Sequence, residues 1–136
     1  MQTIEVGQRA VFTKTITAAD IEAFAMATGD NNPVHLDEAF ATATRFGGRI
    51  AHGILTVGLI SACIARNWPG SIYLSQQVRF LKPVRPNDRI SAEVQVTALD
   101  GQRGRVTLRT VWVNQAGEQV IDGSAEVWVP GGLGGR

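Results

Sequence analysis

Hydrophobic and polar residues follow two different periods along this chain, one in each half. In the first half, Val11–Ile16 alternates weakly and predicts a short strand or an extended lead-in. Thr17 and Gly29 then bound a predicted helix, as its N-cap and its C-terminal stop. Apolar or small residues recur along one face of that helix at i, i+3, i+4 and i+7, namely Ile21, Phe24, Ala25 and Thr28.

The next segment interrupts the helical pattern with turn residues. Pro33 disfavours a helical conformation for Asn32, and asparagine is itself a strong turn former, so the stretch from residue 30 to 33 cannot continue the helix. Asp37 is a suitable N-cap for a second short helix that reaches about Thr44 and stops at the glycine pair 47–48.

A run of apolar residues from Gly53 to Arg66 predicts a buried central helix. Its apolar side chains fall on every face, which is typical of a helix enclosed by other structure. The surrounding stretch from residue 50 to 65 is shorter than the roughly 20 residues that a membrane-spanning helix needs, and it contains a histidine. Small residues along the helix would let a sheet or a partner helix approach closely: Gly58, Ser61, Ala62 and Ala65.

The second half has a period of two, as strands do. It predicts four antiparallel strands in meander order: 72–82, 89–99, 105–113 and 119–129, with Gly123 as a bulge in the last. A helical half followed by such a sheet is an α+β fold. We expect one domain over residues 1–130, a flexible tail over 131–136, and a homodimer, because a single sheet leaves a face and edges to cover.

Composition narrows the classes of function. The 136 residues suit one domain with a real core, and a net charge of +1 from scattered basic residues gives no footprint for nucleic acid or an anionic membrane. The single cysteine, Cys63, excludes an internal disulfide and is expected in the core. A cytoplasmic location fits this composition, and the N-terminus does not resemble a signal peptide.

The stretch Gly29–Asp37 concentrates the residues that could carry chemistry. Asp30 and His35 lie five positions apart across a forced turn, so that their side chains could converge on one small molecule. A carboxylate and an imidazole suit the removal of a proton from water and the delivery of a proton to carbon. The alternative is that both are ordinary turn residues, and the spacing by itself does not decide between the two.

A second candidate lies where the central helix begins. Backbone N–H groups at Gly53 are unpaired at a positive helix end, which suits an oxyanion developing on a thioester carbonyl; the alternative is an ordinary helix start. His52 could be a purely structural residue, and Ser61 could bond a backbone carbonyl. A metal site from His35, His52 and Asp37 is disfavoured, because they lie on different elements without ligand-pair spacing, so no metal is expected.

The order of these residues resembles a known motif. Gly29-Asp30-Asn31-Asn32-Pro33-Val34-His35 is similar to the G-D-x-N-P-hydrophobic-H motif of the MaoC-like, or (R)-specific enoyl-CoA hydratase (hydratase 2), family of hot-dog proteins. His52-Gly53-Ile54-Leu55 resembles the segment that opens that family's central helix, and Val78–Val84 resembles a strand after it. The resemblance extends from about Val6 to Val129.

This resemblance implies a hot-dog fold, with an antiparallel sheet wrapped around the central apolar helix (about Gly53–Arg66) and paired across a dimer. It implies that Asp30 and His35 hold the catalytic water, with Asp30 as base and His35 as proton donor to the α-carbon. Gly53 would polarise the thioester carbonyl, Asn32 would brace the turn, and Ser61 matches a serine near the family's active site. No cofactor is implied beyond the coenzyme A or acyl carrier protein of the substrate, whose phosphates Lys82 or Arg85 could meet.

The expected activity is therefore the reversible syn addition of water to a trans-2-enoyl thioester, a hydro-lyase reaction. Two alternatives remain. A hot-dog acyl-CoA thioesterase typically carries a carboxylate on the central helix, and residues 53–65 contain none. A non-catalytic acyl-thioester binding domain would not need the intact Asp30 and His35 pair. The sequence leaves open the acyl chain length, the thioester carrier, and the pathway, whether polyhydroxyalkanoate supply, fatty acid degradation or dehydration in synthesis.

Overall fold

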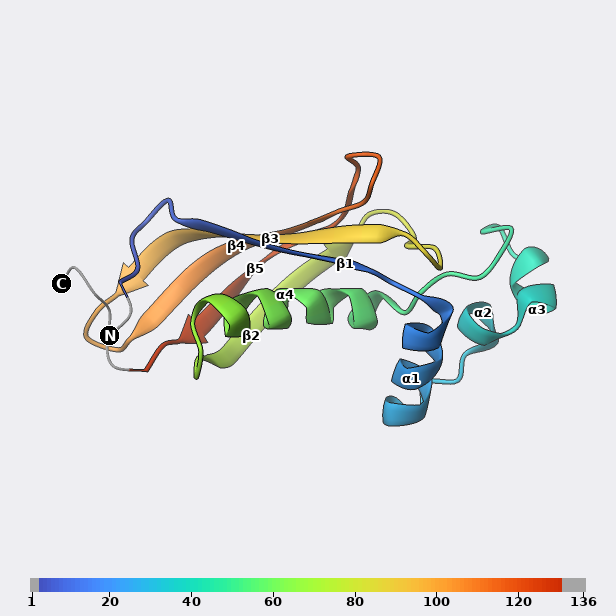
Figure 1. The fold of residues 1–136 in the computed structure, drawn as a ribbon, viewed down its shortest axis with the longest axis horizontal. Coiled ribbons are helices and arrows are strands. Elements are labelled where there is room, and N and C mark those ends of the chain that lie inside the picture. The colour runs from blue at the N-terminus through green and yellow to red at the C-terminus, as the bar shows by residue number, and fades with distance from the viewer. Residues whose placement is uncertain (1–2, 131–136) are drawn as a thin grey trace.

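A five-stranded antiparallel sheet with one long helix along its side forms most of the structure, a computed structural model that describes residues 3–130 (Figure 1). The predicted flexible tail, residues 131–136, lies outside the described residues. The elements in chain order are β1 (Arg9–Thr15), α1 (Ala18–Thr28), α2 (Pro33–Leu36), α3 (Glu38–Thr42), α4 (Gly53–Asn67), β2 (Ile72–Phe80), β3 (Arg89–Asp100), β4 (Arg105–Val113) and β5 (Gln119–Trp128).

Helix α1 begins and ends where the sequence predicts. The Thr17 hydroxyl accepts from the Asp20 N–H at 3.1 Å and the Asp20 carboxylate accepts from the Thr17 N–H at 3.0 Å, which makes a capping box. The hydrogen bond from the Thr17 N–H to the Asp20 carboxylate lowers the pKa of Asp20, and the ion pair with Lys14 lowers it further. Gly29 ends the helix at a φ of 85°, a left-handed conformation that glycine adopts without steric cost.

The sheet has the order β1-β3-β4-β5-β2, so the predicted meander is only partly correct. Strands β3, β4 and β5 follow one another as expected, but β2 pairs with β5 at one edge and β1 joins β3 at the other. Strand β2 cannot pair with its successor in sequence because β1 already occupies the free side of β3. All four pairings are antiparallel, which confirms the predicted type of sheet.

The predicted bulge at Gly123 is wrong. Gly123 stands in regular register with Val78 on β2 and Thr110 on β4, while the register shifts lie elsewhere, next to Tyr73, Val96 and Trp112. The glycine is there for another reason: a Cβ atom at this position would lie 1.8 Å from the Gln77 carbonyl oxygen. Residue 123 therefore allows two backbones to approach closely, a second common use of glycine in strands.

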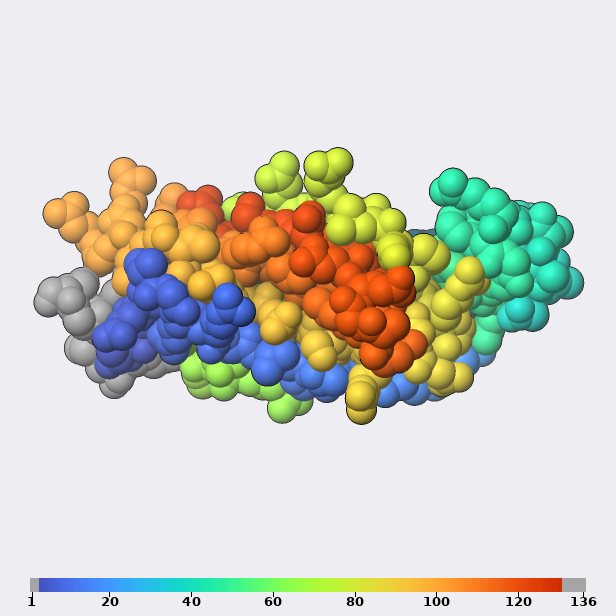
Figure 2. All heavy atoms as spheres, turned by 90° about the horizontal axis from the view of Figure 1, so that it is seen from above, coloured from blue at the N-terminus to red at the C-terminus, as the bar shows by residue number. Residues whose placement is uncertain are grey.

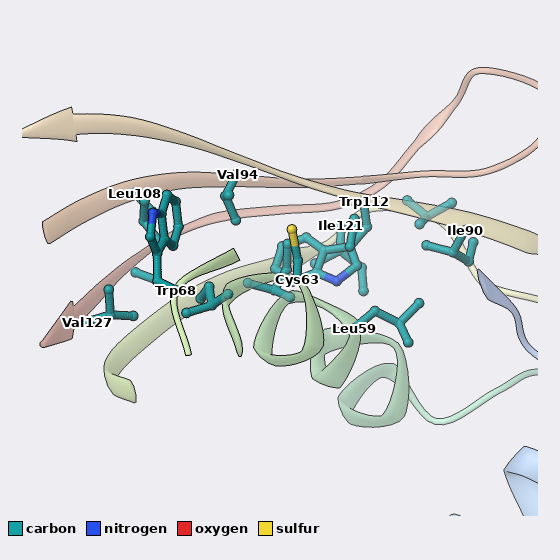
Figure 3. Close-up of a cluster of buried hydrophobic side chains, with 14 of the residues drawn as sticks. Leu59, Cys63, Trp68, Ile90, Val94, Leu108, Trp112, Ile121 and Val127 are labelled. Atoms are coloured by element: carbon teal, nitrogen blue, oxygen red, sulfur yellow. The ribbon is translucent and has the colours of Figure 1, made fainter. Parts of the chain in front are cut away.

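The hydrophobic core lies between the sheet and α4 (Figure 3). Helix α4 packs on β1 and β3, and the Trp112 indole of β4 donates to the Thr56 carbonyl of the helix at 2.9 Å. Cys63 is fully buried, as predicted, and burial raises the pKa of its thiol to about 11, so that it stays protonated. The sequence-predicted antiparallel sheet around a central apolar helix is thus confirmed.

One face of α4 is left uncovered, which corrects the expectation that the helix is enclosed on all sides. The exposed positions recur at helical spacing, and Ile54 keeps 60% of its surface in contact with solvent. The physical reason is that one curved sheet can cover only one side of a helix. Of the helices within residues 3–130, none has the length and apolar character that crossing a membrane requires. The exposed α4 face consists of Ile54, Gly58, Ser61 and Ala65.

Candidate active site

The chain leaves the sheet after β1, and the segment from residue 30 to 52 lies at that end of the molecule, between α1 and the start of α4 (Figure 1). Figure 2 shows the part of this segment around α3 as a lobe beyond the end of the sheet. The segment contains α2, a single turn that the sequence analysis did not predict. Pro33 is its first residue, where a missing N–H costs nothing, and the Asn32 side chain caps it by accepting from the Val34 N–H at 3.2 Å. This cap supports the predicted role of Asn32 in bracing the turn.

Asp37 serves as a helix cap, as predicted, rather than as a ligand. Its Oδ1 accepts from the Phe40 N–H at 3.1 Å at the start of α3. The helix ends at Thr42, two residues earlier than expected, and the chain then turns through Gly47 at a φ of 68°. Asp37 is therefore committed to α3 and does not join the histidines, contrary to the ligand set that the sequence suggested as a remote possibility.

Asp30 is exposed and points into the turn that follows α1. Its Oδ1 accepts weakly from the Asn32 N–H at 3.4 Å, and its own N–H donates to the Thr28 hydroxyl at 3.2 Å. These local bonds fix the backbone on both sides of the carboxylate. Within the described residues the second carboxylate oxygen has no hydrogen-bond donor, so it is free to accept a hydrogen bond from water or a ligand.

His35 lies on α2 with its ring oriented by a carbonyl. Its Nδ1 is 2.7 Å from the Ile50 carbonyl oxygen. Because a carbonyl can only accept, Nδ1 must carry the proton, and the neutral ring presents a lone pair at Nε2. The half-buried ring can therefore exchange protons with a ligand only through Nε2.

The structure brings Asp30 and His35 together, as the sequence predicts, and adds His52. One ligand-capable atom from each of the three side chains lies within 4.8 Å of the others. The His52 ring is 4.0 Å from the His35 ring, centroid to centroid, and its Nε2 lies 3.0 Å from the Asp30 carbonyl oxygen. From the sequence, His52 could equally be a purely structural residue. Its place directly before Gly53, as one of only two histidines, was the available signal.

The three side chains could also hold a metal ion, since one ligand-capable atom from each lies within 4.8 Å of the others. Two of the imidazole nitrogens are already in use, because His35 Nδ1 and His52 Nε2 each lie at hydrogen-bond distance from a backbone carbonyl. The expectation that no metal is bound stays a prediction.

Gly53 opens α4 beside the catalytic candidates. Its preceding residue makes no side-chain capping bond, so N–H groups of the first turn remain available at the positive helix end. A Cβ at Gly53 would lie 2.4 Å from the Phe80 ring, which shows how closely this half-exposed ring covers the helix start. His35, Gly53 and Phe80 together line a cleft of about 390 Å³.

Three other predicted residues occupy different positions. Ser61 lies on the exposed α4 face and does not line the cleft. Lys82 lines the cleft but is paired with Glu118, whose pKa is lowered by that contact. Arg85 donates to the Gly48 carbonyl at 3.3 Å. Arg45, which the sequence analysis did not select, also lines the cleft; its guanidinium stacks on the Phe46 ring at 4.8 Å and has no carboxylate partner among residues 3–130.

Comparisons with known proteins find relatives over most of the chain. The family model described as MaoC like domain matches residues 2–118. The 3-hydroxybutyryl-CoA dehydratase of Methylorubrum extorquens is 43% identical over 93% of this chain and 82% of its own length. The (R)-specific enoyl-CoA hydratase of Aeromonas caviae is 43% identical over 95% of this chain and 98% of its own length. The unliganded R-hydratase of Pseudomonas aeruginosa superposes with a TM-score of 0.88 at 47% identity, covering 93% of this chain and 83% of that one.

Proposed function

We propose, because this chain belongs to the MaoC-like domain family, that it is an (R)-specific enoyl-CoA hydratase. It would add water reversibly, in syn fashion, to a trans-2-enoyl thioester and give an (R)-3-hydroxyacyl thioester. The observation that carries this proposal is the convergence of Asp30 and His35 beside the open N-terminus of α4. His35 and Gly53 line the cleft of about 390 Å³ there, while Asp30 lies next to His35 and is not itself one of the lining residues. Relatives named as hydratase or dehydratase over nearly the whole chain support it.

Each group would have one role in the reaction. The Gly53 N–H binds the thioester oxygen and stabilises the negative charge that develops there. Asp30 takes one proton from water while the hydroxyl adds to the β-carbon. His35, after Nε2 has taken up a proton, gives that proton to the α-carbon from the same side. Transfer of the Asp30 proton to His35 restores the starting state, so the cycle needs no cofactor.

The direct test replaces each proton-transfer residue in turn. We expect Asp30→Ala and His35→Ala each to lower kcat for hydration of crotonyl-CoA by about 100-fold or more, the usual contribution of general acid–base groups. The melting temperature should change little, since Asp30 is exposed and His35 is half-buried. Near-normal rates in both variants would contradict the proposal, and chiral analysis of the product would test the (R) assignment.

Two other functions make different predictions in the same assay. A thioesterase would release free thiol from acyl-CoA, but α4 carries no carboxylate between Gly53 and Asn67. A non-catalytic binding domain would bind acyl-CoA saturably without turnover. Appearance of free thiol, or binding without hydration, would favour these alternatives in turn.

We assign the anionic carrier of the substrate to the Arg45 side of the cleft. Lys82 is neutralised by Glu118, whereas the Arg45 guanidinium is exposed and free of carboxylates within the described residues. Arg45→Gln should raise KM for crotonyl-CoA several-fold, in keeping with the loss of an exposed charge contact of about 1 kcal/mol. It should leave KM unchanged for the phosphate-free crotonyl thioester of N-acetylcysteamine. Lys82→Gln is the matched control, which should change KM for crotonyl-CoA less than Arg45→Gln does and should also leave KM for the phosphate-free thioester unchanged.

A homodimer is the proposed assembly, formed through the β2 edge of the sheet. Strand β2 ends the sheet and leaves its outer backbone groups without a neighbour among residues 3–130. Apolar side chains on and beside it are exposed, namely Ile72, Leu74, Phe80, Leu81 and Trp128. Light scattering should give twice the chain mass, and Leu74→Lys should lower it. A cytoplasmic location, consistent with the single free thiol, completes the proposal.

A further inference from the structure

His52 is buried against two aromatic rings, in a position called the slot below. It is 2% exposed, and its ring lies 4.7 Å from the Phe24 ring and 4.0 Å from the His35 ring, centroid to centroid. His52 is the N-cap residue of α4, but its side chain makes no capping hydrogen bond to that helix. The slot thus joins α1, α2 and the start of α4 through a single imidazole.

The two nitrogens of His52 are used unequally. Nε2 is 3.0 Å from the Asp30 carbonyl oxygen, so it carries the proton and donates. Nδ1 is buried and has no hydrogen-bond partner among the described residues. A phenylalanine would pack in such a slot without an unpaired nitrogen, so packing by itself does not explain a histidine here. The Nε2 hydrogen bond is the contact that an apolar ring would lose.

We propose that His52 is a positioning residue, which holds the backbone of Asp30 and the ring of His35 at a fixed distance from Gly53. It is covalently attached to Gly53, donates to the Asp30 carbonyl and makes a tilted ring contact with His35, so it touches all three parts of the site. In kinetic terms this inference rests on the proposed hydratase function. Its structural part, the orientation of His35 and Asp30, stands independently of any activity.

The local structure explains why such a tie is needed. Asp30 is exposed, and the turn around it is held by bonds within its own neighbourhood, to Thr28 and Asn32. The α2 turn is anchored to the body of the protein by the His35 Nδ1 bond to Ile50 and by the bond from the Ile50 N–H to the Val34 carbonyl. The His52 bond is the one that reaches Asp30 from α4, and the chemistry tolerates little displacement between a base and the bound carbonyl.

Three substitutions separate the hydrogen bond from the ring. His52→Gln places an amide N–H close to where Nε2 stands and can still donate to Asp30. His52→Asn places its amide at the position of Nδ1, too short to reach. His52→Phe keeps a ring in the slot but has no donor. Melting temperatures of all three establish that each variant is folded before any rate is compared.

The expected kinetic result is a loss in kcat that follows the donor. With crotonyl-CoA, His52→Asn and His52→Phe should lower kcat by about 10- to 100-fold, as for a displacement on the order of 1 Å, with KM nearly unchanged. His52→Gln should retain a kcat several-fold above both. Rates of His52→Asn and His52→Phe within about twofold of the wild type would overturn the inference, and so would a His52→Gln variant as impaired as His52→Asn.

A second readout does not depend on turnover. The chain has only two histidines, so in each variant His35 supplies the single imidazole signal in a ¹⁵N–¹H spectrum. The Nδ1–H signal of His35, protected by its bond to Ile50, should persist in His52→Gln and be lost to exchange in His52→Asn. An unchanged signal in both would overturn the inference. If the wild-type protein fails to hydrate crotonyl-CoA while the two variants still differ in the His35 signal, the proposed function is overturned and the role of His52 is retained.

Discussion

The sheet with its helix and the segment between residues 29 and 53 are held by different interactions. In the core, Leu108, Trp112 and Ile60 are fully buried, and the long strands β3, β4 and β5 pair along most of their length. In the segment, α2 and α3 are only four and five residues long, and side-chain caps and single hydrogen bonds hold them. Burial of apolar surface therefore stabilises the first region, while local polar contacts shape the second.

This difference separates stability from chemistry along the chain. A residue of the core can change the free energy of unfolding without reaching the reacting atoms. A residue of the segment can displace Asp30 or His35 at little cost to folding, because few apolar contacts are lost. The predictions below test that separation, beginning with the change expected to have the greatest effect.

Leu108→Ala should produce the largest loss of stability. Leu108 is 0% exposed on the central strand β4, and truncation of such a leucine typically costs about 3 kcal/mol through lost contacts and the cavity left behind. Urea unfolding measures the loss, and kcat per folded molecule should remain close to that of the wild type. The neighbouring, exposed Arg109→Ala is the control. A parallel fall in kcat would mean that the two regions are not separate.

Asn32→Ala should give the opposite pattern. It removes the cap on the Val34 N–H, which costs about 1 kcal/mol of stability, a typical value for a lost N-cap. The α2 turn carries His35, so kcat should fall by about tenfold, or 1.4 kcal/mol of transition-state stabilisation. Asn32→Ser restores a capping oxygen and should recover most of the rate. Full activity of Asn32→Ala would show that the cap does not position the histidine.

Asp20→Asn should have a small effect that depends on pH. The pKa of Asp20 is lowered in the folded protein, chiefly by the Thr17 N–H, so its charged form stabilises the fold above the unfolded pKa of about 3.9. This stabilisation is lost as the pH falls through the folded pKa. We expect the variant to be less stable than the wild type by under about 1 kcal/mol at pH 7. The difference should shrink towards pH 2, and a constant difference would contradict the assignment.

Cys63 should show no reaction at all in the native state. Its thiol is buried, and a pKa of about 11 keeps it protonated at neutral pH. A colorimetric disulfide reagent at pH 8 should therefore detect no thiol until urea unfolds the core, and then one per chain. Reaction at the rate of a free thiol would mean that the core opens readily.

Local signals predicted the elements well and their partners less well. Thr17 and Gly29 bound α1 as expected because a cap acts within a few residues, and β4 spans the predicted 105–113 because alternation is local. The pairing of β2 with β5 was missed, since no short-range pattern records which distant strand supplies a neighbour. The α2 turn was missed because Pro33 was interpreted as a helix breaker, whereas at the first position it begins a helix.

The site shows the same limit. Asp30 and His35 were predicted to converge, because a forced turn joins them over five residues. The proposed positioning role of His52 depends on its ring contacts. One of them is with Phe24, which lies 28 positions earlier in the sequence, so only the folded chain defines it. The sequence likewise could not show that Arg45 is the cleft cation without a carboxylate partner among the described residues. Lys82 is paired with Glu118, and that ion pair is defined only by the fold.

The strand order has a consequence for how the protein forms. The three central strands, β3, β4 and β5, are consecutive and lie in the last third of the chain, so their hairpins can close over short loops. The edge strands β1 and β2 must wait for β3 and β5 to dock on. During synthesis the residues of the site emerge first, yet the sheet that orients them exists only after residue 128 has left the ribosome. The nascent segment between residues 29 and 53 therefore stays unassembled until nearly the whole chain is made, and the proposed activity should lag behind sheet formation during refolding.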